Sequence, residues 1–269
     1  MQTPALPHRS STLLVAFALS VVCLIPLEQW IPGFLAFGVC LILLWRSKDP
    51  TLQRRLGVLL ACVLTLAFAP ISTSTSNLNF LALGVPFVAV LLIPWWVLRR
   101  YDPGVLDYTF WPRKFSPLET AYTLLSIPVA WLAFRLYFGV LSPEVPFNWT
   151  LPTVPTFEAL ARLFAGINLV GIWDELFFIN IAFAILRSLY PLGAANLVQA
   201  TLYTAVLFDM AFTGWGPLFV FALALTQGVM FERSKVLLYV IVVHLIVDYF
   251  LFQEIVEAYY PNFSVWWHP

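Results

Sequence analysis

WDELFFIN, residues 173–180, places two adjacent carboxyl groups inside an apolar run that is long enough to cross a membrane. An ionised side chain is costly at that depth, so intramembrane acids are rare and are typical of functional sites. Farther along the chain, His244 and Asp248 repeat the pattern in a second apolar run. Together the two runs predict a polar reaction centre below the surface of a membrane.

The composition places the chain among integral membrane proteins. Hydrophobic residues make up 61% of the 269 residues and charged residues 10%, and the mean hydropathy is +0.87. Soluble domains carry about 25% charged residues. The 14 basic and 14 acidic residues cancel, so nothing indicates a nucleic acid or a highly charged partner. The cysteines Cys23, Cys40 and Cys62 lie in apolar runs and are typical of buried hydrophobes.

Hydropathy predicts an all-α bundle of eight or nine transmembrane helices with no soluble domain. A spanning helix needs about 20 predominantly apolar residues, and prolines in the connection 142–155 favour an extended loop. The candidate spans are residues 12–27, 31–45, 56–71, 78–98, 118–141, 157–189, 193–212, 217–231 and 236–255.

Basic residues predict the orientation of this bundle. They gather in two loops and near two later helix ends, whereas the loops 72–79 and 142–156 have none. By the positive-inside rule the basic loops and the N-terminus should be cytoplasmic. We therefore expect a multi-pass protein of the plasma membrane, which in a bacterium is the inner membrane. The basic residues are Arg46, Lys48, Arg54, Arg55, Arg99, Arg100, Arg113, Lys114, Arg187, Arg233 and Lys235.

Helical geometry constrains the four polar residues. Asp174 and Glu175 are adjacent, so their side chains diverge by about 100°, and we expect one of them to face the centre and the other to turn to a neighbouring helix. His244 and Asp248 are four residues apart and share one helix face. The alternative is that such groups only hold the bundle in register through interhelical hydrogen bonds. With Asp209 and Gln227 on the helices between the two runs, we favour a functional site.

These motifs resemble the CAAX-protease and bacteriocin-processing family of membrane endopeptidases. Residues 174–180 are similar to its first motif, a Glu-Glu pair followed after three residues by Arg. The run from Gly228 through Arg233 to His244 and Asp248 is similar to its last motif, in which a charged turn precedes a helix bearing His-x-x-x-Asn or Asp. The resemblance covers residues 157–252, and the order and spacing of the motifs make it moderately specific.

The resemblance implies a glutamate-type intramembrane endopeptidase whose site opens toward the cytoplasmic side. Carried over by position, Asp174 is the carboxylate that activates water, and His244 with Asp248 forms the oxyanion side. Desolvation inside a bundle suits a carboxyl group for work as a base, and His244 can donate to an oxyanion. Asp248 donates only when protonated, so it is the better candidate for orienting His244.

Three positions depart from the family pattern. Asp174 replaces Glu, Ile179 replaces Arg, and Phe212 replaces the histidine of the middle motif Phe-x-x-x-His, which begins here at Phe208. Asp209 is the candidate substitute for that histidine, because it lies three residues before position 212 and near the same face.

Glu175 is an alternative base. A shift of the motif by one residue would make Glu175 the primary carboxylate and would put Asn180 at the Arg position. The unshifted register is preferred because Leu-Phe-Phe then falls where the family has it.

The expected partners are the lipid bilayer and a membrane-associated peptide or protein substrate. We expect residues 1–141 to form N-terminal transmembrane helices and residues 157–256 to form the catalytic core of one membrane domain. No cofactor is expected, although a carboxylate-rich Mn or Fe site is the alternative. The rival functions are a catalytically inactive scaffold that binds membrane partners and a proton-coupled transporter.

Overall fold

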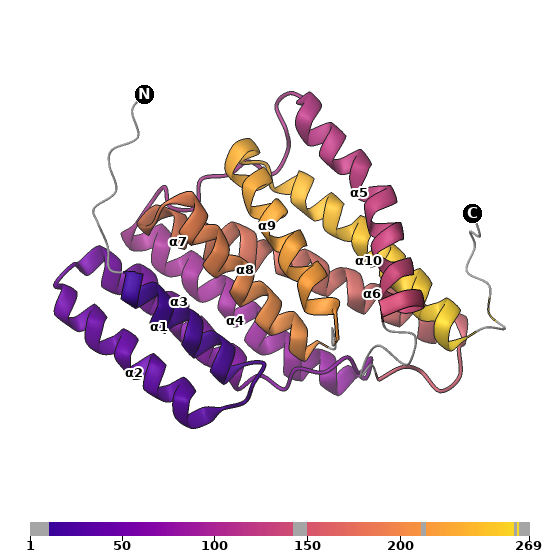
Figure 1. Ribbon diagram of the computed structural model, residues 1–269, viewed down its shortest axis with the longest axis horizontal. Coiled ribbons are helices and arrows are strands. Elements are labelled where there is room, and N and C mark those ends of the chain that lie inside the picture. Colours follow the sequence, from indigo (N-terminus) through magenta and orange to yellow (C-terminus); the bar gives the residue numbers. More distant parts are fainter. Residues whose placement is uncertain (1–10, 142–149, 211–213, 261–262, 264–269) are drawn as a thin grey trace.

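The chain forms a bundle of helices (Figure 1). The structure is a computed structural model that describes residues 11–141, 150–210, 214–260 and 263, apart from the side chains of Leu141 and Asp209. Within these residues there is no strand, only an isolated bridge between Thr109 and Val236. The helices are α1 Ser11–Leu24, α2 Trp30–Ser47, α3 Pro50–Ala67, α4 Asn77–Tyr101, α5 Pro117–Leu136, η1 Tyr137–Leu141, α6 Phe157–Asp174, η2 Glu175–Phe183, α7 Ala184–Leu189, α8 Leu192–Asp209, α9 Gly216–Ser234 and α10 Leu237–Tyr259.

The predicted all-α bundle is confirmed, whereas the predicted number of eight or nine spans stays a prediction. Five helices are long and apolar enough to cross a membrane, counted over the described residues. The predicted span 157–189 is one continuous rod of 33 residues, in which the π-helix η2 separates α6 from α7. The five spans are Trp30–Ser47, Asn77–Tyr101, Pro117–Val140, Phe157–Leu189 and Leu237–Tyr259.

One end of the bundle, here called the basic face, gathers the connections that carry the basic residues. Thr109 N donates to Lys235 O at 2.8 Å, and Arg187 pairs with Glu232 at 2.8 Å. These contacts join segments that are far apart in sequence. The predicted grouping of the basic loops on one side is therefore confirmed, and their assignment to the cytoplasm stays a prediction.

A buried acid organises part of the basic face. Asp102, directly after α4, accepts hydrogen bonds from Arg54 Nη2 at 3.1 Å and Arg55 Nη2 at 3.0 Å. The hydrogen bond from Arg54 is the main reason that the pKa of Asp102 lies below its usual value. The paired carboxylate ties the end of α4 to the start of α3.

The other end, the opposite face, is held by uncharged loops. Arg162 of α6 donates to Thr75 O at 2.8 Å, and Thr150 N donates to Thr73 Oγ1 at 2.8 Å. The hydroxyl of Tyr260, just after α10, donates to Pro152 O. The connections between α3 and α4 and before α6 therefore meet at one end.

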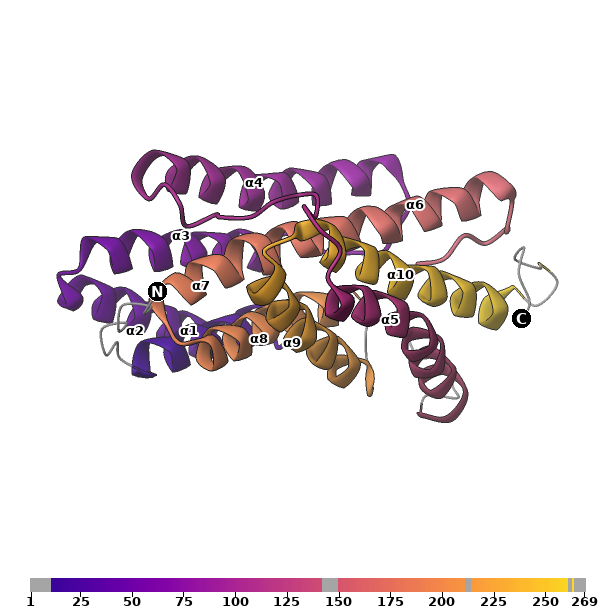
Figure 2. The ribbon, with the colours of Figure 1, turned by 90° about the horizontal axis from the view of Figure 1, so that it is seen from above.

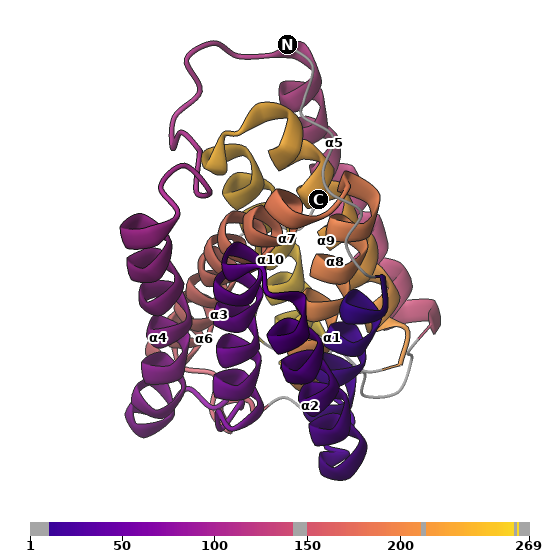
Figure 3. The ribbon, with the colours of Figure 1, turned by 90° about the vertical axis from the view of Figure 1, so that its left-hand side faces the viewer.

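The site lies on the rod formed by α6, η2 and α7, which packs against α4, α8, α9 and α10. Figures 2 and 3 show α4 along one side of this rod, with α10 and α8 on other sides. The main hydrophobic core runs from α1 to α10, and a second cluster joins α5, α6 and the end of α10. The core therefore continues from residues 1–141 into 157–256, and the proposed division between them stays a prediction.

Candidate active site

The helix that carries the two acids is fixed at its start and beside the acids. Thr156 caps α6 by accepting a hydrogen bond from Ala159 N at 3.2 Å. Trp173 Nε1 donates to Phe87 O of α4 at 2.8 Å, and the two rings stack with their centroids 3.7 Å apart. The residue preceding Asp174 is thus locked against α4.

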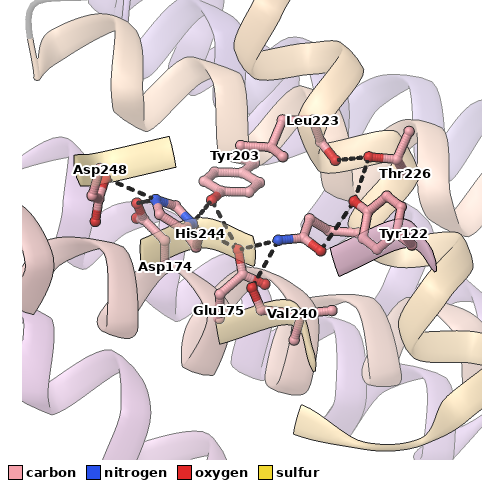
Figure 4. A network of polar contacts seen from close by, with 10 residues as sticks. Tyr122, Asp174, Glu175, Tyr203, Leu223, Thr226, Val240, His244 and Asp248 are labelled. Atoms are coloured by element: carbon pink, nitrogen blue, oxygen red, sulfur yellow. Dashed lines mark hydrogen bonds and ion pairs between the residues drawn. The ribbon is translucent and has the colours of Figure 1, made fainter. Parts of the chain in front are cut away.

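One edge of the His244 ring is filled by protein partners. Nδ1 lies 2.8 Å from Glu175 Oε1 and 2.8 Å from the hydroxyl of Tyr203, which in turn donates to Glu175 Oε1 at 3.1 Å (Figure 4). Glu175 and Tyr203 are both 0% exposed. Because an ionised carboxylate only accepts hydrogen bonds, Glu175 favours the ring form that carries a proton on Nδ1.

The other edge of the ring faces two further carboxyl groups. Nε2 of His244 lies 3.7 Å from Asp174 Oδ2 and 3.5 Å from Asp248 Oδ1. Neither oxygen of Asp174 has a hydrogen-bond partner among the described residues, and Asp248 Oδ2 has none either. These carboxyl groups are therefore free to bind a water molecule or a substrate.

A chain of polar side chains continues from Glu175 across α9 to α5. Gln227 Nε2 donates to Val240 O at 2.9 Å and approaches Glu175 Oε1 at 3.4 Å. The hydroxyl of Tyr122 lies 3.3 Å from Gln227 Oε1 and 2.8 Å from Thr226 Oγ1. This chain holds Glu175 in place from the side away from His244.

Both adjacent acids reach His244, whereas one of them was expected to turn toward another helix. Their side chains do diverge, but an imidazole ring presents a nitrogen at each of two edges. Glu175 meets Nδ1, and Asp174 lies beside Nε2. The arrangement of Asp248 on the same helix face as His244 is confirmed.

A cavity of about 900 Å³ ends at this centre. Asp174, His244 and Asp248 line it, whereas Glu175 and Tyr203 do not. Most of the remaining lining is apolar and comes from α4, α5, α6, α9 and α10. Exposed lining residues such as Val129 and Leu169, each 63% exposed, show that the cavity is open at the side of the bundle.

The cavity extends toward the opposite face. It is also lined by residues of the connection 72–79, and its described lining includes no residue of the basic loops. The resemblance implies a site open to the cytoplasm, and the basic loops predict that the cytoplasm lies at the other end. Because this cavity extends away from the basic loops, it cannot open to the cytoplasm if the basic loops are cytoplasmic.

Gly171 makes the close approach of α6 and α10 feasible. A Cβ at this position would overlap the carboxyl group of Asp248 and the ring of His244. The absence of a side chain on α6, one turn before Glu175, therefore lets the two site helices bring their polar groups together.

Some of the predicted positions contribute differently. The side chain of Asp209 and all of Phe212 lie outside the described residues. Ile179, at the expected Arg position, is 0% exposed within the hydrophobic core. Asn180 lines a second pocket at the basic face.

Sequence reasoning missed Tyr203 and Tyr122. Aromatic residues in an apolar helix look like core residues, and their hydroxyl groups are relevant only once partners on other helices are known. The available signal was weak: Tyr203 lies four residues after Gln199, so two polar-tipped side chains share one face of α8.

The side chains of the described residues were compared with the requirements of a metal site. No group of three or more His, Cys, Asp or Glu residues among them is arranged to hold a metal ion. The expectation of a reaction without a cofactor stays a prediction.

Comparison with known proteins identifies the C-terminal part of the chain. Residues 156–250 match the family described as type II CAAX prenyl endopeptidase, Rce1-like. No curated protein sequence and no solved structure matches the chain. The matched segment contains η2, the start of α10 and all four acidic and imidazole groups of the centre. Over residues 156–250, and over these residues alone, the chain is similar to the CAAX prenyl endopeptidase family.

Proposed function

We propose that the protein is an intramembrane endopeptidase that hydrolyses a peptide bond of a membrane-associated peptide or protein. One observation carries the proposal: three carboxyl groups from two helices surround His244, and two of them line the inner end of an apolar cavity. A purely structural hydrogen-bond network would have no need of carboxyl oxygens without partners at a cavity wall.

Asp174 is the residue that activates water in this proposal. Its free oxygens lie in the cavity beside Nε2 of His244, so a water molecule there has an acceptor and a polarising group. Attack of the water oxygen on the peptide carbonyl transfers one water proton to Asp174. The protonated His244 donates from Nε2 to the oxyanion. The C–N bond then breaks, and Asp174 returns the proton to the leaving nitrogen.

Glu175 and Tyr203 are positioning residues. Glu175 does not line the cavity, but its hydrogen bond to Nδ1 fixes the ring so that Nε2 points into the cavity. Asp248 lies at the Nε2 edge, where it balances the charge of a protonated His244. This assignment keeps Asp174 as the base and makes Glu175 the residue that orients the ring.

Tyr203 supports activity despite the missing histidine of the middle motif. It brings a polar contact from α8 to His244 and Glu175 without any contribution from Phe212. The contact from α8 to the centre thus comes from Tyr203, about two and a half turns before position 212 at about 3.6 residues per turn.

The cavity lining favours an apolar substrate. Its walls are largely aliphatic and aromatic, with the charged groups confined to the inner end and to Arg162 near the opposite face. A peptide carrying a prenyl chain, which the family description names, fits this environment. An unmodified transmembrane peptide fits it as well, so both substrate classes belong in the test.

The protein purified in detergent should be given two fluorescence-quenched peptides that end in the Cys-aliphatic-aliphatic-X sequence, one farnesylated and one unmodified. We expect cleavage of at least one of them, with kcat falling by about 10²–10⁴-fold in Asp174→Asn and in His244→Gln. Tyr249→Phe, on the same helix as His244 but outside the cavity lining, serves as the control and should keep full activity.

The rival functions give different results in the same variants. If both peptides and membrane extracts stay uncleaved while the biological function survives Asp174→Asn, the protein is a scaffold. Substrate accumulation in proteoliposomes driven by a proton gradient, without a cleaved product, would indicate a transporter. Glu175→Gln distinguishes the two carboxyl roles, because a positioning residue should leave more activity than the base.

The protein is an integral membrane protein, because the described residues include five helices long and apolar enough to cross a membrane and residues 156–250 match the CAAX prenyl endopeptidase family. We propose further that the basic face is cytoplasmic, as the loop charges predict. Reporter fusions in the connections 102–116 and 68–76 should then respond on the cytoplasmic and the extracytoplasmic side, respectively.

A further inference from the structure

Gln199 is a buried polar side chain that the catalytic proposal does not use. It is 0% exposed, and neither Nε2 nor Oε1 has a hydrogen-bond partner among the described residues. Burying an amide without partners costs about 1–3 kcal/mol by protein mutational data. A fully buried amide of this kind is normally satisfied by an ordered water molecule.

Asn180 shows the same feature nearer to the surface. Its side chain is 5% exposed, and Oδ1 is buried without a partner. It lines a pocket of about 410 Å³ at the basic face, together with Arg55, Arg187 and Lys235. The pocket includes exposed loop residues, so it connects the side chain of Asn180 with the aqueous surface.

A third side chain with a free atom, that of Glu175, lies at the centre itself. Oε1 of Glu175 takes all the hydrogen bonds that the carboxyl group makes with Tyr203, Gln227 and His244. Oε2 is buried and has no partner in the described part of the chain. The carboxyl group therefore keeps an acceptor for a further donor.

Helix geometry places these groups in one row. In a π-helix the N–H of residue i+5 bonds to the carbonyl of residue i, so Glu175 and Asn180 are neighbours one turn apart. Gln199 lies one turn from Tyr203 on α8, and α8 packs against η2 through the stacked rings of Tyr203 and Phe178, 4.5 Å apart. Both amides therefore lie on the basic-face side of Glu175.

We propose that a file of water molecules runs from the basic-face pocket past Asn180 and Gln199 to Oε2 of Glu175. Polar groups beyond direct hydrogen-bond reach are commonly bridged in this way. The file would satisfy the free atoms of all three side chains. It would also connect the catalytic centre with water on the side opposite to the opening of the apolar cavity.

The role of the path in turnover rests on the proposed peptidase function, but its existence does not. For a hydrolase, the path lets Glu175 and His244 exchange protons with the basic face while an apolar substrate fills the cavity. Water and substrate would then approach the His244 ring from its two different edges.

Cysteine labelling tests the path without any assay of activity. In a background with Cys23, Cys40 and Cys62 replaced by serine, the variants Asn180→Cys and Gln199→Cys are placed in proteoliposomes of defined orientation. A small, membrane-impermeant methanethiosulfonate reagent is then added on one side. We expect both cysteines to react from the basic face and not from the opposite face.

Two further variants locate the path. Leu202→Cys, 0% exposed on the same helix and outside both cavity linings, should stay unlabelled from either side. Asn180→Leu in the Gln199→Cys background should abolish labelling of Cys at position 199, because a leucine blocks the entrance. Asn180→Ser, small and polar, should preserve it, and size-exclusion profiles verify that each variant is folded.

Each outcome decides the proposal. Labelling of Gln199→Cys from the opposite face, labelling that survives Asn180→Leu, or no labelling of the folded variant overturns the path. Labelling as expected in a protein that cleaves no peptide supports the path and counts against the peptidase function alone.

Discussion

The helices that carry the centre and the helices around them use their surfaces differently. In Phe157–Leu189, 72% of the apolar window is buried inside the protein, and in Leu237–Tyr259, 67%. In Trp30–Ser47 and Pro117–Val140 only 17% is buried. The ionisable groups of the centre lie on the two protein-enclosed helices. The difference teaches that an apolar span is a suitable carrier of acids only where other helices shield it from lipid.

Hydropathy does not separate these two classes of helix. The interior of a membrane protein and the lipid around it are both apolar, so a buried helix and a lipid-facing helix have similar compositions. Here α4 has the higher mean hydropathy, 2.3 against 1.9 for Phe157–Leu189, although it is much less buried.

The comparison is tested most strongly by removing one large side chain from each class. Phe178 is 0% exposed and stacks on Tyr203, whereas Leu132 of α5 is 51% exposed. We expect Phe178→Ala to lower the free energy of unfolding by about 3–5 kcal/mol and Leu132→Ala by less than about 0.5 kcal/mol. Reversible unfolding in mixed micelles measures both values. Equal losses would mean that the outward side of α5 is packed against protein.

The next prediction compares the effect on stability of a methyl group added to an enclosed helix and to a helix at the periphery. Gly171→Ala would press into Asp248 and His244, whereas Gly57→Ala on α3 meets nothing within 4 Å. Overpacking costs about 1–3 kcal/mol, so we expect Gly171→Ala to lower both stability and cleavage. Gly57→Ala should be neutral or stabilising, because alanine favours a helix over glycine. An active, fully stable Gly171→Ala would show that α6 and α10 can separate without loss.

The basic face supplies a pH-dependent contrast outside the membrane spans. The pKa of Asp102 is lowered, chiefly by the hydrogen bond from Arg54. Its stabilising effect is therefore complete above the unfolded pKa of about 3.9 and is lost as the pH falls through the lower folded value. We expect Asp102→Asn to lose about 1–2 kcal/mol at neutral pH and to show less destabilisation on acidification.

Thermal unfolding of the detergent-solubilised protein at several pH values measures this effect. Asp107→Asn, an exposed acid of the same connection, is the matched control and should behave like the unaltered protein. A wild-type stability that is independent of pH between about 2 and 5, where carboxyl groups normally titrate, would contradict the assignment.

The smallest expected effect is that of metal removal. The three carboxyl groups surround the edges of one imidazole, and we expect the reaction to proceed without a metal ion. Cleavage of the reporter peptide should be unchanged after treatment with EDTA. An inhibition that is reversed by adding Mn²⁺ or Fe²⁺ would overturn this expectation, and elemental analysis of the purified protein checks it independently.

The position of the site could be predicted from sequence because acids in apolar spans are costly. Asp174, Glu175, His244 and Asp248 stand out on that ground alone, and the four-residue spacing of the last two predicts their shared face. Their partners could not be predicted in the same way. Gln227 stands out as a polar residue in an apolar run, but Tyr203 does not, and the contacts of both with Glu175 depend on how α8, α9 and η2 pack.

The π-helical conformation of residues 175–183 was also beyond sequence reasoning. Patterns with α-helical spacing place Asn180 off the face of Glu175, whereas the i+5 periodicity of η2 makes them neighbours. Such a change of periodicity depends on how the surrounding helices pack and leaves no mark in composition.

By itself the sequence determined a multi-pass helical membrane protein, the grouping of its basic loops and the identity of the ionisable residues, because hydropathy, charge and helical period are local properties. The tertiary structure alone decided that Glu175 meets one edge of His244 and Asp174 the other. It also decided which helices are enclosed by other helices and that the cavity extends toward the opposite face. These features depend on contacts between distant segments, and an apolar chain can make such contacts in several arrangements that have the same hydropathy.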